Sequence, residues 1–104
     1  MITAVFKTRD GGLYGFRISG HSGYSEAGSD IVCAAVSAMA FLTANTVTEC
    51  FGEEADIRAD ETEAVMEMAG KSPSAAANGI IRGFLHEMRS LEEDYPEFVR
   101  VTVQ

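Results

Sequence analysis

The feature that most constrains the fold is the apolar stretch Ile31–Cys50, which contains neither glycine nor proline. A segment of this length without a helix-breaking residue predicts a helix. Ser29 or Asp30 is a suitable N-cap, because a side-chain oxygen there accepts a hydrogen bond from a first-turn amide, and Phe51-Gly52 supplies a stop. Because its start is apolar nearly all round, we expect it to be the buried central helix. One face is traced by Ile31, Ala35, Ala38, Leu42 and Thr46, with Val32, Val36 and Met39 beside it.

Two pairs of alternating segments flank this helix and predict two hairpins. Apolar or aromatic side chains occupy every second position of residues 2–7 and 14–19, and Asp10-Gly11-Gly12 lies between these segments. Glycine accepts the positive φ that a tight hairpin turn requires, so this tripeptide is a strong turn signal. Residues 55–60 and 63–68 alternate in the same way after the helix.

A second helix and a last strand complete the predicted order. Apolar residues recur at helical spacing from near Ser74 onward, and Tyr95-Pro96 breaks the pattern. Residues 98–103 then alternate as a closing strand. The order β-β-α-β-β-α-β is typical of an α+β fold, and we expect a mixed sheet with two packed helices. A chain of 104 residues suits one domain, residues 1–104.

Charge and targeting signals narrow the class of protein. The net charge is −8, from 16 acidic and 8 basic residues, which disfavours direct binding to nucleic acid and suits a basic partner. Two cysteines are too few for a disulfide scaffold, and the N-terminus lacks the pattern of a signal peptide. The apolar run 31–44 is too short to span a bilayer. We therefore expect a cytoplasmic protein that does not contact a membrane.

The start of the first helix suggests a reactive cysteine. The preceding segment, residues 20–28, has three glycines in nine residues and predicts a mobile loop of the kind that often carries function. If Asp30 is the N-cap, Cys33 is the third helical residue, and its sulfur lies near the free amides of the first turn. The positive end of a helix favours the thiolate, which is the nucleophilic form of cysteine. His21, after the first hairpin, is the base within reach.

Several roles around this pair stay open. Asp30 either caps its own helix, which places a negative charge beside Cys33, or holds His21 as the third member of a triad. Ser37, one turn beyond Cys33, could bond the sulfur or a substrate carbonyl, or bond back to a carbonyl of its own helix. Amides near Val32 and Cys33 are candidate donors to an oxyanion.

The remaining candidate residues point to no cofactor. Cys50 lies too far along the helix from Cys33 for a disulfide, and we expect it to be buried at the helix end. His86 lies in a polar stretch and should face solvent. One histidine pair with two distant cysteines does not form a zinc set, and the loop glycines lack the lysine of a phosphate-binding motif. We predict neither a metal nor an organic cofactor.

One string of residues resembles a known family. Gly20-His21, a short loop, Gly28 and the run Asp30-Ile31-Val32-Cys33-Ala34-Ala35-Val36-Ser37 are similar to the motif of the ribosomal-processing cysteine protease family, Prp. The length and the predicted order of elements agree with the family as well.

The resemblance implies a bacterial cytoplasmic endopeptidase. Such enzymes remove a short N-terminal extension from a large-subunit ribosomal protein and are homodimers. The resemblance implies that His21 and Cys33 are the catalytic pair, with Asp30, Ser37 and Gly20 in support. Ser22 stands where alanine is more often expected, and we expect no consequence from this difference.

Three other functions are consistent with the same residues. The first is a non-catalytic, ribosome-associated peptide-binding protein, in which the Cys33 thiol would be inert. The second is another cysteine acyl-transfer enzyme, such as a thioesterase, which would turn over small thioesters. The third is a structural dimer without a site, which leaves the glycines of the loop unexplained.

Overall fold

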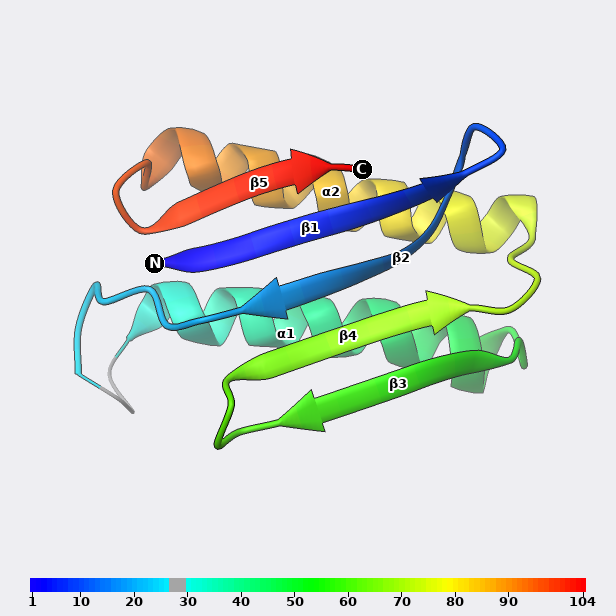
Figure 1. The fold of residues 1–104 in the computed structure, drawn as a ribbon, viewed down its shortest axis with the longest axis horizontal. Coiled ribbons are helices and arrows are strands. Elements are labelled where there is room, and N and C mark those ends of the chain that lie inside the picture. The colour runs from blue at the N-terminus through cyan, green and yellow to red at the C-terminus, as the bar shows by residue number, and fades with distance from the viewer. Residues whose placement is uncertain (27–29) are drawn as a thin grey trace.

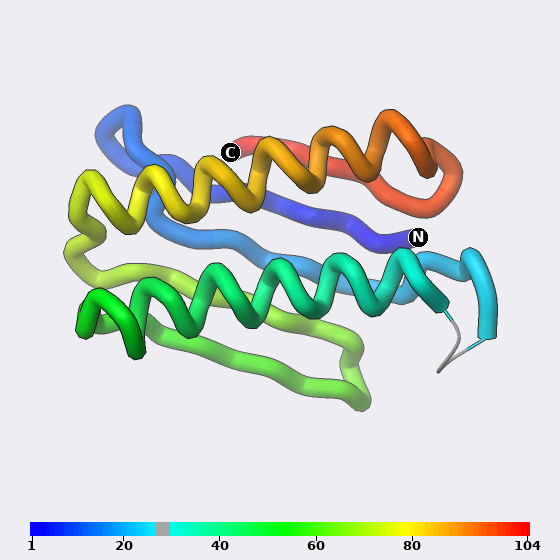
Figure 2. The backbone as a smooth tube through the Cα atoms, turned by 180° about the vertical axis from the view of Figure 1, so that it is seen from behind, coloured from blue at the N-terminus to red at the C-terminus, as the bar shows by residue number. Residues whose placement is uncertain are grey.

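The structure is a computed structural model, and it describes residues 1–26 and 30–104. Five strands form one sheet in the order β3-β4-β2-β1-β5, in which β5 runs parallel to β1 and the other neighbours pair antiparallel. Both helices lie on the same face of this sheet, α2 behind β1 and β5, and α1 behind β2 and β4 (Figure 1 and Figure 2). The elements are β1 (Ile2–Arg9), β2 (Gly12–Ser19), α1 (Ile31–Asn45), the π-helical turn η1 (Thr46–Cys50), β3 (Ala55–Asp60), β4 (Val65–Gly70), α2 (Ala75–Asp94) and β5 (Val99–Val103). The predicted α+β fold, a mixed sheet with two packed helices in β-β-α-β-β-α-β order, is confirmed.

The first hairpin has the turn that its sequence predicts. Asp10 and Gly11 both have positive φ, 52° and 81°. Two such residues form a turn whose twist matches that of the paired strands. Phe6 of β1 then lies opposite Phe16 of β2, so that both rings face the helices.

The second hairpin begins its return strand two residues later than the sequence predicts. β4 starts at Val65, which pairs with Asp60, and residues 61–64 form the turn. The backbone N–H of Glu63 donates to Asp60 Oδ1 at 3.1 Å. This bond stabilises the turn. The turn includes residues 63 and 64, for which the alternating pattern had predicted a strand.

Three phenylalanine rings form the centre of the core between the sheet and α2. The Phe84 ring meets Phe6 and Phe16 edge to face, with centroids 5.2 and 4.9 Å apart. Such pairs contribute about 0.5–1.5 kcal/mol each beyond the burial of their area.

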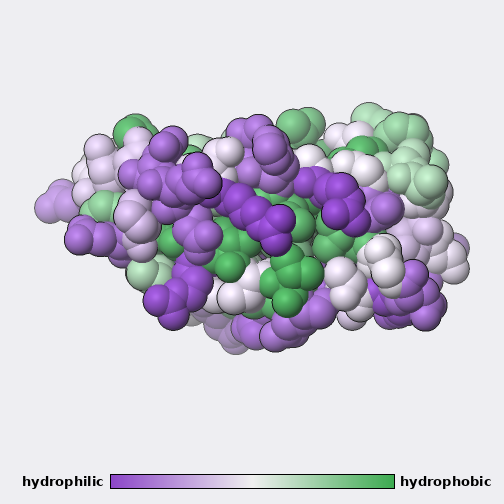
Figure 3. Space-filling model, turned by 90° about the horizontal axis from the view of Figure 1, so that it is seen from above, coloured by the Kyte–Doolittle hydropathy of each residue, from purple (hydrophilic) through white to green (hydrophobic). Residues whose placement is uncertain are grey.

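Seen from above, the side of the molecule formed by β5 and α2 shows hydrophobic surface between rows of hydrophilic side chains (Figure 3). Val101 is half-buried there and Val103 is exposed.

The face of α1 that packs on the sheet is not the one first traced from the sequence. The buried residues of α1 are Val32, Val36, Ala40, Thr43 and Ala44. Ile31 and Leu42, members of the predicted face, are 58% and 68% exposed. Apolar residues surround this helix, so hydrophobicity alone does not select a face. The prediction of a fully buried central helix is therefore wrong, because one side of α1 faces outward.

The apolar helical stretch is also longer than the run of residues 31–44 considered above. Ile31–Cys50 is long and apolar enough to cross a membrane by length and composition alone, and 33% of its most apolar window is buried. The core helix of a globular domain meets the same criteria, and here the buried side of α1 packs into the core cluster.

The last turn of this stretch widens into η1. Its end is marked by a bond from Phe51 N–H to Thr46 O at 3.1 Å, which spans five residues. The Thr46 and Thr48 hydroxyls donate back to the carbonyls of Leu42 and Ala44, at 2.6 and 2.9 Å. Such bonds compete with the backbone amides for the same carbonyls, which favours the wider turn. Cys50 is exposed at this end, so the expectation that it is buried is wrong.

The start of α2 is fixed by Ser74. Its hydroxyl accepts from Ala77 N–H at 3.1 Å, the geometry of an N-cap. Its own N–H and hydroxyl donate to the Glu53 carboxylate at 3.0 and 2.5 Å. These hydrogen bonds from Ser74 lower the pKa of Glu53 below its ordinary value. The predicted beginning of the second helix near residue 74 is confirmed.

We expect Gly15→Ala to destabilise the fold, because a Cβ at Gly15 would lie 2.2 Å from the carbonyl oxygen of Met68 in the neighbouring strand. The free energy of unfolding in urea should fall by about 1–3 kcal/mol, as in an overpacked core. Gly79→Ala is the matched control, since nothing lies within 4 Å of a Cβ there and alanine favours helix by about 1 kcal/mol. Equal losses in the two variants would contradict the close approach of β2 and β4.

Candidate active site

A cleft of about 1020 Å³ lies between the first half of α1 and the turn that joins β3 to β4. Every residue predicted for the site lines it: Gly20, His21, Asp30, Cys33 and Ser37. The structure therefore brings together residues that are up to 17 positions apart in the chain. Gly28 of the motif and Ser29, the alternative N-cap, lie outside the described residues.

The walls of the cleft differ in chemistry. Apolar side chains of β1, β2, β4 and α1 contribute Ile2, Ile18, Met66 and Phe41. Asp60 at the end of β3 and Glu61 in the turn that follows contribute acidic groups. The cleft thus offers apolar surface and negative charge to the same ligand.

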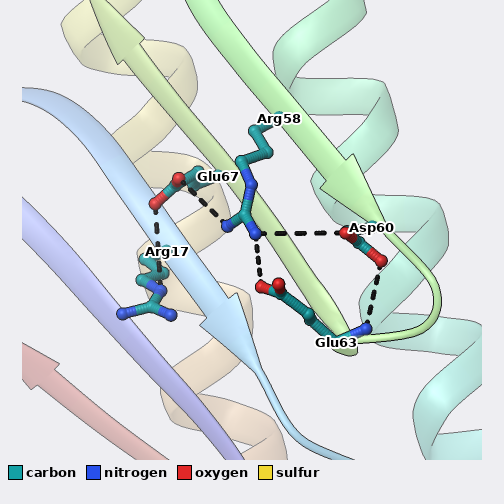
Figure 4. A network of polar contacts seen from close by, with 5 residues as sticks. All are labelled: Arg17, Arg58, Asp60, Glu63 and Glu67. Atoms are coloured by element: carbon teal, nitrogen blue, oxygen red, sulfur yellow. Dashed lines mark hydrogen bonds and ion pairs between the residues drawn. The ribbon is translucent and has the colours of Figure 1, made fainter.

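Ion pairs on the outer face of the second hairpin hold this turn. Arg58 bonds Glu63 and lies 4.0 Å from Asp60 and 3.6 Å from Glu67 (Figure 4). These partners raise the pKa of Arg58 above its ordinary value, chiefly through the hydrogen bond to Glu63. All four side chains are partly exposed, so each pair contributes little to stability and the network mainly orders the turn.

Gly20 allows the chain to leave β2 beside the N-terminus. Its φ is +88°, and a Cβ there would lie 2.4 Å from the carbonyl oxygen of Met1. Its N–H donates to Ala64 O at 2.9 Å, which ties this point to the start of β4. Only glycine fits this position, and the next residue, His21, is thereby directed to the cleft.

Asp30, one of the two candidates from the sequence, is the N-cap of α1. Its φ and ψ, −81° and 102°, are extended, and its Oδ1 accepts from Cys33 N–H at 2.9 Å. Cys33 is consequently the third helical residue. Of the amides near Val32 and Cys33 that are candidate donors to an oxyanion, the Cys33 N–H is already bonded to the cap.

Ser22 is the residue that sequence reasoning missed. Its hydroxyl donates to Asp30 Oδ2 and accepts from Tyr24 N–H at 3.0 Å. Its own N–H donates to Cys33 Sγ at 3.4 Å. Ser22 and the Cys33 N–H together lower the pKa of Asp30 to about 2. The expectation that serine at this position has no consequence is therefore wrong.

Asp30 caps the helix rather than holding His21. One carboxylate oxygen accepts from Cys33 and the other from Ser22. His21 is exposed at the mouth of the cleft, and across residues 1–26 and 30–104 no hydrogen bond joins its imidazole to Asp30 or Cys33. Ser37 is exposed on the cleft wall one turn beyond Cys33.

An aromatic cluster anchors the first part of the loop. Tyr24 meets Tyr95 and Phe98 edge to face, with centroids 5.5 and 5.4 Å apart. Both partners come from the connection between α2 and β5, which is remote from the motif in sequence. No local pattern signals such a contact, and the loop that we expected to be mobile is attached at this point.

The arrangement suits covalent chemistry at sulfur. Cys33 is half-buried, lines the cleft at the positive end of α1, and accepts an N–H at its sulfur. A helix start and an N–H directed at the sulfur are the surroundings typical of a nucleophilic cysteine. Within the described parts of the chain, no three or more His, Cys, Asp or Glu side chains are grouped to hold a metal ion.

Comparison with known proteins identifies relatives over the whole chain. Residues 1–100 match the family described as Cysteine protease Prp. The ribosomal processing cysteine protease Prp of Bacillus subtilis (strain 168) is 33% identical over 108 residues, which cover 98% of this chain and 96% of that protein. The protein of the same name from Staphylococcus aureus (strain Mu50) is 29% identical over 103 residues, 97% of each chain.

Solved structures agree with the fold in full. The essential ribosomal processing protease Prp from S. aureus, in complex with a covalently linked product peptide, superimposes with a TM-score of 0.91 at 28% identity. The same protease in complex with a substrate peptide gives a TM-score of 0.87 at 27% identity, and both chains are covered completely in each comparison. This chain therefore belongs to the cysteine protease Prp family and is a cysteine-type peptidase.

Proposed function

We propose that the chain is an endopeptidase that removes a short N-terminal extension from a bacterial large-subunit ribosomal protein, with Cys33 as nucleophile and His21 as base. The observation that carries the proposal is the shared cleft, which both Cys33 at the start of α1 and His21 after β2 line. The whole chain, residues 1–104, serves as a single protease domain. Membership of the Prp family supports the substrate class.

The reaction is acyl transfer to sulfur. The Cys33 thiolate attacks the carbonyl carbon of the scissile peptide bond, a C–S bond forms, and the C–N bond breaks as the His21 imidazolium gives its proton to the leaving amine. His21 then takes a proton from water, which attacks the thioester and releases the second product and the thiolate. The covalently linked product peptide on the S. aureus relative supports such an intermediate. No step requires a metal or an organic cofactor.

His21 needs a substrate to complete this geometry. The imidazole is exposed and has no bond to the sulfur across the described ranges, although both groups face the same cleft. Catalytic hydrogen bonds often tighten when substrate binds. A peptide lying over the cleft would exclude water and confine the His21 ring above Cys33, because the loop that carries both His21 and Tyr24 is anchored at the aromatic cluster.

Charge supports a basic peptide as the substrate. The chain carries a net charge of −8, and Asp60 and Glu61 line the cleft beside its apolar wall. An N-terminal tail of a ribosomal protein, with apolar and basic residues, would be attracted electrostatically and then bury its apolar side chains. The same charge opposes direct contact with nucleic acid, and the expected location is the cytoplasm.

We also propose that the chain is a homodimer, which would cover the outward face of α1. Ile31 and Leu42, which do not line the cleft, expose 58% and 68% of their surfaces on this helix. Large apolar side chains gathered on one helix are typical of an interface. A second copy of the chain is the occupant that a symmetric dimer supplies.

The nucleophile is tested by cleavage of the organism's own precursor ribosomal protein, followed by intact mass. We expect wild type to release one N-terminal fragment, and Cys33→Ala and Cys33→Ser to lose on the order of 10³-fold or more of the rate. Cys50→Ser is the matched control and should keep wild-type activity, since Cys50 is exposed at the far end of the helix. Cleavage by a folded Cys33→Ala protein would exclude the mechanism, and turnover of small thioesters instead of the precursor would indicate a thioesterase.

The base is tested in the same assay. His21→Ala should lower kcat by about 10²–10⁴-fold, the usual contribution of a positioned acid–base group. His86→Ala should leave the rate unchanged, because His86 is exposed on α2. Similar rates in wild type and His21→Ala would remove His21 from the mechanism while leaving Cys33 as nucleophile.

The dimer is tested by sedimentation equilibrium. Leu42→Glu places a charge on the exposed apolar face of α1 and should convert a dimer to a monomer without loss of helix content. Ser90→Glu adds the same charge to the exposed side of α2 and should leave the mass unchanged. A monomeric wild type, or a dimer that persists in Leu42→Glu, would contradict an α1 interface.

A further inference from the structure

Ser22 is buried although it lies in an exposed loop. It is 2% exposed, whereas its neighbours His21 and Gly23 are exposed. A buried hydroxyl requires partners, and this one has two, since it accepts from Tyr24 N–H and donates to Asp30 Oδ2. The side chain therefore joins the loop to the N-cap of α1.

The backbone of the same residue contacts the sulfur. Ser22 N–H donates to Cys33 Sγ at 3.4 Å. A hydrogen bond to an ionised acceptor is stronger than one to a neutral acceptor, so this N–H stabilises the thiolate over the thiol. The direction in which the Ser22 N–H points depends on where the Ser22 hydroxyl is held, because the N–H and the hydroxyl belong to the same residue.

The Asp30 carboxylate, in contrast to the Ser22 N–H, disfavours the Cys33 thiolate. Its negative charge lies at the Cys33 amide, 2.9 Å from the nitrogen, and the Cys33 side chain is also a hydrogen-bond partner of the carboxylate. A nearby negative charge and an acceptor for the S–H both favour the neutral thiol. The Ser22 hydroxyl occupies Oδ2 and is the largest cause of the lowered pKa of Asp30. Removing it would leave Oδ2 available to the S–H.

We propose that Ser22 is a positioning residue for the nucleophile, whose hydroxyl holds Asp30 Oδ2 and thereby keeps the Ser22 N–H on Cys33 Sγ. The proposal rests on Cys33 as the nucleophile of the proposed function. Loss of the hydroxyl disfavours the thiolate in two ways. The Ser22 N–H is released from the sulfur, and the Asp30 carboxylate becomes a better acceptor for the S–H. The thiolate then forms at higher pH.

Besides Asp30 and Cys33, the titratable groups that line the cleft among the described residues are His21 from the loop, Asp60 at the end of β3, and Glu61 in the turn that follows. The test therefore measures the Cys33 thiolate itself, by the pH dependence of its alkylation with iodoacetamide. All variants carry Cys50→Ser, so that one thiol reacts. Repeating the profile with His21→Ala separates ionisation of the imidazole from that of the thiol.

Ser22→Ala should move the midpoint of the alkylation profile upward by about 0.5–1 pH unit and slow alkylation at pH 7 by about three- to tenfold. Peptide cleavage should fall at pH 7 and recover at higher pH. Ser22→Thr, which keeps a hydroxyl, should restore the wild-type midpoint. Thr43→Val is the matched control, because it removes a different buried hydroxyl, one on α1 that donates to Met39 O at 2.7 Å. It should leave the midpoint unchanged.

A second measurement needs no variant at Ser22. In the wild-type protein, the NMR shift of the Ser22 amide proton should change with pH with the same midpoint as alkylation, as expected for a donor to the sulfur. A Ser22 amide that does not respond to ionisation of Cys33, or a folded Ser22→Ala protein with the wild-type midpoint, would overturn the proposal. Neither readout requires substrate, so cleavage by Cys33→Ala would refute the proposed nucleophile without altering this result.

Discussion

The two oxygens of one carboxylate hold the site together. Asp30 accepts from Cys33 N–H with Oδ1 and from the Ser22 hydroxyl with Oδ2. The first bond starts α1 and sets Cys33 in its first turn, and the second brings the loop after β2 onto the helix. Because the same loop carries His21, the position of its imidazole relative to the Cys33 sulfur depends on this single side chain.

The core determines where that carboxylate lies. Val32 and Val36 anchor the first turns of α1 in the core cluster, and Phe6, Phe16 and Phe84 fill the space between the sheet and α2. The start of α1 is thereby placed next to the end of β2 and the turn between β3 and β4. The cleft is the space that these three ends leave open, and both apolar and acidic residues line it.

The loop between His21 and Cys33 combines two constraints of different origin. Ser22 ties it to the helix by hydrogen bonds, while Tyr24 ties it to the connection between α2 and β5 by ring contacts. In the proposed mechanism, the exposed His21 side chain, on a loop attached at both points, approaches a bound peptide without rebuilding the site. Cleavage would then depend on occupancy of the cleft, which limits reaction with other chains.

The sequence alone predicted the order of the elements, two candidates for the N-cap of α1, and the residues that line the cleft. Asp10-Gly11, Asp30 and Ser74 act through groups within a few residues, and the motif from Gly20 to Ser37 lies in one short segment, so both could be predicted. Only the tertiary structure decided which face of α1 is buried, because a helix that is apolar all round gives no preference. It also decided the roles of Ser22 and Tyr24, whose partners are fixed by folding of the loop onto α1 and the end of α2. Spacing along the chain does not encode such contacts, since their free energy arises from packing between distant segments.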